Sequence, residues 1–118
     1  MINPARPAPG APLIALKKLK KHDAIVLEFR EGEAWFSMIV ARGDGDDVYG
    51  YENLCPHAMS PLERFDGRVL ILDRKYLICA MHGASFRITD GACAGGPALG
   101  MRLTPIALTI EDGTVKLA

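Results

Sequence analysis

Short runs of branched and aromatic residues, separated by glycine and aspartate clusters, recur along most of this chain. Runs of this length and composition are typical of strands, and no long stretch has the spacing of a helix. The fold class is therefore all-β. Strands are predicted at residues 12–16, 24–30, 35–42, 48–52, 69–72, 76–79, 85–88, 105–111 and 114–117. The pair Asp112-Gly113 predicts a hairpin between the last two strands, because tight hairpin turns need positive φ.

The chain has 118 residues, a length that suits one domain. Its first twelve residues hold four prolines and no periodic pattern. Residues 1–11 are therefore predicted to form an extended tail outside the core, and residues 12–118 a single domain. Residues 53–67 and 80–100 are loops rich in Gly, Pro and Ala, and we expect function on them because strands can hold irregular loops rigidly.

Basic and acidic residues balance at 14 each, so the net charge is zero. A neutral chain has no broad basic field for nucleic acid or anionic lipid, and the lysines at residues 17–21 are typical of a solvated turn. We expect no nucleic-acid partner. No apolar stretch is long enough to span a membrane, and residues 1–12 lack the apolar region of an export signal. We therefore expect a cytoplasmic protein with no membrane partner.

Two short segments each join one cysteine to one histidine. Residues 55–57 read Cys-Pro-His and residues 79–83 read Cys-Ala-Met-His-Gly, with 21 residues between His57 and Cys79. In a reducing compartment, three cysteines are more consistent with metal ligands or buried thiols than with disulfides. Proline and glycine tighten the two loops, so that each can direct a thiolate and an imidazole toward one point.

The pattern C-x-H followed by C-x-x-H-G resembles the motif of Rieske proteins. The likeness covers about residues 12–118, and the ligand motif is its most specific part. Small Rieske ferredoxins share further features with this chain, namely Asn53, Phe86, the Asp90-Gly91 turn and Gly96-Pro97.

This resemblance implies an antiparallel, Rieske-like β domain in which a cluster-binding part, about residues 50–100, is inserted into a β base. It implies one [2Fe-2S] cluster per chain, with Cys55 and Cys79 on one iron and His57 and His82 on the other. It also makes residues 95–97 similar to the family's proline loop. Pro97 is then expected to cover the cluster, and a rigid turn between two strands is the alternative interpretation.

The function that the resemblance favours is a ferredoxin carrying one electron at a time from a reductase to an oxygenase or reductase. Oxygenases of the family also need a mononuclear iron site, usually two histidines and a carboxylate, and only His22 is left once His57 and His82 are used. The chain is therefore an electron-transfer component and not a complete enzyme. A permanently docked small Rieske subunit of a multisubunit enzyme, such as a nitrite reductase, is the alternative.

Two other chemistries use the same residue types. Zn²⁺ accepts two thiolates and two imidazoles, which would make the chain a zinc-stabilised binding module, but zinc fingers pair Cys with Cys and His with His. A cysteine nucleophile with a histidine base needs one such pair and an orienting group, whereas this chain has two pairs. Both are less favoured than the cluster.

Other side chains are assigned to packing. Cys93 has no nearby histidine and is predicted to be a small buried side chain in a turn. Trp35 and Met38 fall in the strongest strand pattern and are predicted to be core. Met59 and Met81 flank the ligands, where they form either an apolar rim around the cluster or simple loop packing.

High-potential Rieske proteins of respiratory complexes place serine and tyrosine hydroxyls beside the cluster, at positions matched here by Ala84 and Phe86. Hydrogen bonds to sulfur stabilise the more negative reduced cluster. The absence of both hydroxyls therefore predicts a midpoint potential near the bottom of the Rieske range, about −150 mV.

Overall fold

The computed structural model describes residues 3–56, 59–63, 67–81 and 83–118. Its elements are β1 (Pro12–Ala15), the 3-10 helix η1 (Leu16–Lys18), β2 (Ala24–Glu31), β3 (Ala34–Arg42), β4 (Val48–Glu52), β5 (Leu70–Leu72), β6 (Tyr76–Ile78), β7 (Ser85–Arg87), β8 (Cys93–Gly95), β9 (Pro105–Ile106), β10 (Leu108–Glu111) and β11 (Thr114–Leu117). No helix in this part of the chain is long and apolar enough to cross a membrane.

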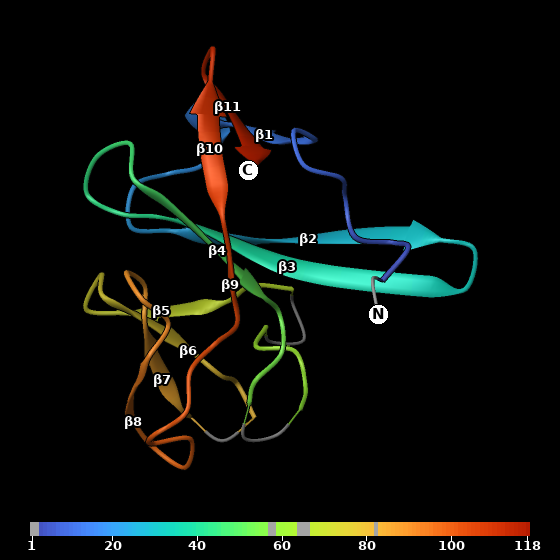
Figure 1. Ribbon diagram of the computed structural model, residues 1–118. Helices are drawn as coiled ribbons and strands as arrows, with labels where there is room; N and C mark the ends of the chain where they lie inside the picture. Colours follow the sequence, from blue (N-terminus) through green and yellow to red (C-terminus); the bar gives the residue numbers. More distant parts are fainter. Residues whose placement is uncertain (1–2, 57–58, 64–66, 82) are drawn as a thin grey trace.

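The strands form three antiparallel sheets, which lie one above another in Figure 1. The sheet β1-β11-β10 lies at the top, β2-β3-β4-β9 lies in the middle, and β5-β6-β7-β8 lies below. Strands β4 and β9 are neighbours in the middle sheet, although the whole lower sheet separates them in sequence. The lower sheet is therefore an insertion into a β base, which confirms the predicted all-β, Rieske-like architecture.

The middle sheet is covered on both faces, and this position explains why β3 is apolar on both of its faces. Phe36, Met38 and Val40 pack in the core shared with the upper sheet, whereas Ile39 and Ala41 pack in the core shared with the lower sheet. Successive strand residues point to opposite faces, so a strand buried on both faces is apolar at every position and does not alternate. Met38 and its three successors in β3 are fully buried.

The predicted strands match the structure closely, with three exceptions. The predicted strand at 105–111 is interrupted, giving β9 and β10, and residues 16–18 form η1. Strand β8 was predicted as a turn, because Cys93-Ala94-Gly95 has none of the large or branched residues that mark a strand. Its pairing with β7 comes from the tertiary context instead. Asp112 and Gly113 have φ of 50° and 75°, as the predicted hairpin requires.

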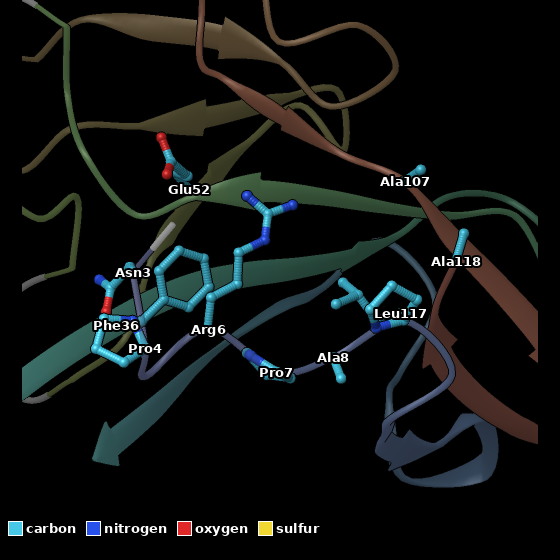
Figure 2. A pocket seen from close by; sticks show the side chains of 11 residues that line it. Asn3, Pro4, Arg6, Pro7, Ala8, Phe36, Glu52, Ala107, Leu117 and Ala118 are labelled. Atoms are coloured by element: carbon cyan, nitrogen blue, oxygen red, sulfur yellow. The ribbon is translucent and has the colours of Figure 1, made fainter. Parts of the chain in front are cut away.

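The exclusion of the N-terminal residues from the core is wrong. Ala5 is 6% exposed and packs with Phe36 and Leu117. The amide of Gly10 donates to the Leu117 carbonyl oxygen at 2.7 Å, and the Arg6 guanidinium lies 5.6 Å from the centre of the Phe36 ring. Figure 2 shows this segment along one side of a groove of about 670 Å³. The apolar surface of Phe36 explains why a proline-rich segment is held here.

The prediction that Trp35 is core is also wrong, because its side chain is 43% exposed. Met38 on the same strand is fully buried, as predicted. Trp35 lies near the start of β3, where the strand pairs only with β2.

A buried tyrosine joins the base to the inserted sheet. The phenol of Tyr51 on β4 donates to the Ile88 carbonyl oxygen at 2.6 Å, and desolvation by burial, with a smaller contribution from Asp90, raises the pKa of Tyr51 far above its ordinary value. The ring lies directly over Gly91, where an added Cβ would be 2.7 Å from Cε1 of Tyr51. Gly91 also has φ of 73°. Only glycine meets both constraints without strain.

We expect Gly91→Ala to lower the free energy of unfolding by about 2–4 kcal/mol, since it adds left-handed strain and overpacks Tyr51. Gly32→Ala is the matched control. Gly32 has φ of 60° but nothing within 4 Å of the added Cβ, so only the backbone strain applies and the loss is about 1 kcal/mol. Denaturant unfolding of both variants measures the difference, and equal losses would contradict the packing argument.

Candidate metal centre

The two predicted cysteine ligands begin two turns with the same hydrogen-bond pattern. In loop 1 (residues 53–63), the amide of Met59 donates to the Cys55 carbonyl oxygen at 2.7 Å, and the Cys55 amide donates to Ser60 O at 2.7 Å. In loop 2 (residues 79–84), the equivalent bonds run from Gly83 to Cys79 at 2.9 Å and from Cys79 to Ala84 O at 2.8 Å. The two cysteine turns therefore share the same pair of backbone hydrogen bonds.

Each turn is closed by a residue in the left-handed region. Gly83 has φ of 74° and Met59 has φ of 54°. Glycine adopts this conformation freely, which gives a physical reason for the glycine of the second motif. Met59 adopts it at a cost of about 1–2 kcal/mol, which the surrounding hydrogen bonds offset.

Both cysteines are buried in the same apolar core. Cys55 is 1% exposed and Cys79 is 0% exposed, and they share a hydrophobic cluster with Leu62, Ala84 and Ala98. A thiolate in such surroundings needs a positive partner, and a metal supplies one. The placement is the one expected of two ligands that face a common, water-excluded centre.

The predicted histidine ligands His57 and His82 lie outside the described residues. In the sequence, His57 falls between Cys55 and the residue that closes its turn, and His82 falls between Cys79 and Gly83. In the described part of the chain no group of three or more His, Cys, Asp or Glu residues lies close enough to hold a metal ion. Two cysteines alone do not make such a group.

The backbone of one residue, Leu62, connects the two loops. The amide of Ala80, next to Cys79, donates to the Leu62 carbonyl oxygen at 3.1 Å, and the amide of Leu62 donates to Oδ1 of Asn53 at 2.9 Å. Leu62 is fully buried. Loop 2 is therefore held by loop 1, and loop 1 is held by a side chain that lies two residues before Cys55.

The Asn53 side-chain amide makes three hydrogen bonds close to the site. Besides accepting from Leu62, its Nδ2 donates to Oγ of Ser37 at 3.0 Å and to Oε2 of Glu63. Asn53 is 4% exposed. The sequence indicates Asn53 only through the resemblance to Rieske ferredoxins. It gives no signal for Ser37, because Ser37 lies on β3, far from Asn53 in the chain.

A third loop lies against loop 2. In loop 3 (residues 95–101), a Cβ added to Gly96 would be 3.0 Å from Cα of Ala84, so the two backbones are in close contact. Ala98 is fully buried, whereas Pro97 is exposed. The structure thus places the proline loop beside the loop that contains Cys79.

The hydroxyl of Ser60 is buried and has no hydrogen-bond partner among the described residues. Buried hydroxyls normally have a hydrogen-bond partner. A buried hydroxyl without one, in the turn that begins at Cys55, therefore fits a site that is completed by a bound group other than protein. The donor set points the same way, because thiolates are ligands for iron–sulfur clusters and for zinc. The described residues therefore fit a thiolate-bound metal group.

The structure places two further predicted positions, Cys93 and Phe86, and the neighbour of one of them. Cys93 lies in β8, so the predicted turn is wrong; its side chain is half-buried against the core that holds the two cysteines, and its thiol donates to the Gly95 carbonyl oxygen at 3.1 Å. Phe86 is fully buried in the core that holds the two cysteines. Ser85, its neighbour on β7, is half-buried, and its Oγ lies 3.4 Å from the position of a Cβ on Gly95. Ser85 is thus on the opposite face of the strand from Phe86.

We expect Asn53→Ala to lower the free energy of unfolding by about 2–4 kcal/mol, because it leaves the Leu62 amide and the Ser37 hydroxyl without their partner. Ser37→Ala removes one bond of the same network and should cost about 1 kcal/mol. Denaturant unfolding measures both losses. A loss for Asn53→Ala no larger than that of Ser37→Ala would show that the Leu62 link is not needed.

No curated protein matches this sequence. Among solved structures, the Sphingomonas yanoikuyae B1 ferredoxin is 28% identical, with a TM-score of 0.68, over 92% of this chain and 96% of that one. The ferredoxin of carbazole 1,9a-dioxygenase from Nocardioides aromaticivorans IC177 is 21% identical, with a TM-score of 0.71, over 94% and 98%. One chain of a complex of reduced oxygenase and oxidized ferredoxin in carbazole 1,9a-dioxygenase is 22% identical, with a TM-score of 0.69, over 91% and 99%.

The two carbazole-system structures share the fold, and the Sphingomonas ferredoxin shares fold and length. The family model described as Rieske [2Fe-2S] domain matches residues 11–108, which include both cysteine turns and the proline loop. The chain belongs to the Rieske [2Fe-2S] domain family.

Proposed function

We propose that this protein is a ferredoxin that carries one electron at a time on one [2Fe-2S] cluster per chain. Cys55 and Cys79 would bind one iron, and His57 and His82 the other. The observation that carries the proposal is the pair of equivalent cysteine turns, joined through Leu62 and buried in one core.

The cluster of this family supplies a site that accepts and releases a single electron, at a potential raised by two neutral imidazoles in place of two thiolates. The protein's own part is to hold the donors. The two turns fix the Cys55 and Cys79 backbones, Asn53 holds Leu62, whose carbonyl accepts from loop 2, and the core excludes water from the thiolates. Pro97 covers the remaining side in this proposal, because its loop contacts loop 2.

We further propose a reductase as electron donor and an oxygenase or reductase as acceptor, in the cytoplasm. Support comes from the oxygenase–ferredoxin complex, whose ferredoxin chain this protein matches along nearly its whole length. A free carrier is favoured over a permanently docked subunit because the ferredoxins it resembles have the same length.

Purified protein is expected to contain two irons and two acid-labile sulfides per chain, as measured by metal and sulfide analysis. Cys55→Ala, His57→Ala, Cys79→Ala and His82→Ala should each lose the cluster and its visible absorption. Cys93→Ser is the matched control, because its thiol makes a local bond within β8, and it should keep the full complement. One zinc per chain without sulfide would refute the proposal.

Ala84→Ser should raise the midpoint potential, because Ala84 stands where high-potential members of the family have a hydroxyl donor. A hydrogen bond to a charged acceptor contributes about 1.5–3 kcal/mol. A bond that favours the reduced cluster by this free energy raises the equilibrium constant for reduction about ten- to a hundredfold. For one electron, this raises the midpoint potential by about 60–120 mV. Protein-film voltammetry measures the shift. Ser85→Ala is the control, because Ser85 points away from the core of the cysteines, and a larger shift for Ser85→Ala would contradict the assignment of the two faces.

A further inference from the structure

Strand β2 is the longest sheet edge of the molecule. It pairs with β3 along its whole length without a register shift, and no strand of the described residues pairs with its other side. It has eight residues, whereas no other edge strand in the described part of the chain has more than four. A long, regular edge presents a row of amide and carbonyl groups to which a further strand can bind.

The sequence of β2 has few of the features that protect an edge strand. It reads AIVLEFRE, with no proline, glycine or lysine, and its pairing with β3 contains no bulge. Charged side chains are its remaining protection, because Glu28, Arg30 and Glu31 are exposed. Glu28 and Arg30 lie two residues apart, so they are on the same face of the strand, and their charges have opposite signs. Such an edge repels a strand only where like charges meet.

The free backbone groups of β2 belong to the residues that carry these two charges. The amide of Arg42 donates to the Asp23 carbonyl oxygen at 2.9 Å, at the start of the β2–β3 ladder. Hydrogen-bonded and non-hydrogen-bonded pairs alternate along antiparallel strands, so the odd-numbered residues of β2 are the ones bonded to β3. The two-residue turn at 32–33 gives the same alternation from the other end of the ladder. The amides and carbonyls of Glu28 and Arg30 therefore point away from β3.

Only the second half of β2 is open to another strand. Residues 23–26 line a cavity of about 290 Å³ together with residues 67–69, so the start of β2 lies beside the segment that leads into β5. Farther along, the side chains of Glu28 and Arg30 are exposed and have no hydrogen bond or ion pair to any other described residue. A strand that binds this edge is therefore limited to about residues 27–31.

We propose that two copies of this protein associate through their β2 edges, antiparallel and centred on Phe29. A twofold axis at Phe29 places Glu28 opposite Arg30 of the second copy, and Arg30 opposite Glu28 of the second copy. Two pairs of opposite charge then form where the outward backbone groups also bond, and opposite-charge pairs across strands are stabilising. The pairing joins two middle sheets into one continuous sheet. It does not depend on the proposed electron-carrier function.

The charges and the shape of the edge select this register. Moving the centre by one residue would place Glu28 against Glu28, or Arg30 against Arg30, and like charges directly opposite each other are destabilising. A centre nearer the start of β2 would bring the second copy against residues 67–69. The register centred on Phe29 meets neither obstacle.

The same register brings apolar surface together at the axis. Phe29 is half-buried, and its ring would meet the Phe29 ring of the second copy at a non-hydrogen-bonded position, where facing side chains are closest. Trp35, which is 43% exposed, is the direct neighbour of Arg30 on β3 and borders the proposed contact. Because each copy has one such edge and the twofold axis uses both, association ends at the dimer.

Sedimentation of the purified protein over a wide concentration range tests the association directly. We expect the average mass to rise from 12.8 kDa toward twice this value and to stop there. Raising the salt from 20 mM to 500 mM NaCl should weaken the dimer by about two- to fivefold, because salt screens the two charge pairs. A protein that stays monomeric at the highest concentrations would overturn the proposal, and so would association that continues past the dimer.

Two charge reversals test the register. Glu28→Arg and Arg30→Glu each turn both opposite-charge pairs into like-charge pairs, so each variant should weaken its own dimer about tenfold or more. Mixing the two variants restores opposite charges at both positions and should restore dimers that contain one copy of each. Lys20→Glu is the matched control, because it makes the same charge change as Arg30→Glu on an exposed side chain before β2, and it should dimerise as the original protein does.

The mixture also guards against a folding defect. Both substituted residues are exposed, and far-UV circular dichroism checks that each variant keeps the strand content of the original protein. A variant that had lost its fold could not form a dimer again on mixing, so dimers in the mixture support the Phe29-centred register. Dimers that persist unchanged in Arg30→Glu alone, or a mixture of the two variants that stays monomeric, would overturn the proposal.

Discussion

The backbone of Leu62 is the connection on which the site depends. Its carbonyl accepts from the residue after Cys79, and its amide donates to a side chain two residues before Cys55. Of the two bonds, the one from Ala80 joins the two loops, and the one to Asn53 holds Leu62 in place within loop 1. The proposed four-ligand site would need a fixed distance between the loops as well as the shape of each turn, because every ligand must reach the same group.

The base explains why this connection is stable. Asn53 follows β4, and its amide reaches Ser37 on β3, the strand with a core on each face. The inserted sheet leaves the base after β4 and returns to it at β9, which pairs with β4. Both ends of the insertion therefore meet at β4, and Tyr51 on β4 adds a bond to the Ile88 carbonyl from within the core.

Much of this could be predicted from the sequence, and the exceptions have physical causes. Strand runs and the Asp112-Gly113 hairpin are local signals, so their positions were predicted well. Strand β8, the burial of Ala5 and the exposure of Trp35 depend on what packs against them, which no local pattern contains. In the site, the residue types at 55–57 and 79–83 indicated the candidate ligands, but the Leu62 link and the contact of Ser37 with Asn53 join distant parts of the chain. The equivalence of the two turns was also hidden, because one closes with glycine and the other with Met59.

The repeated turn has a consequence for the speed of electron transfer. An electron moves quickly only when the atoms around its site need to shift little between the two charge states, that is, when the reorganisation energy is small. Amides held in fixed hydrogen bonds and a dry apolar core cannot rearrange as bulk water does. Because Cys55 and Cys79 are each held by the same two backbone bonds, the protein around the thiolates responds little to the added charge. In the proposed carrier, the loops that shape the site would thus also lower the barrier for the electron to leave it.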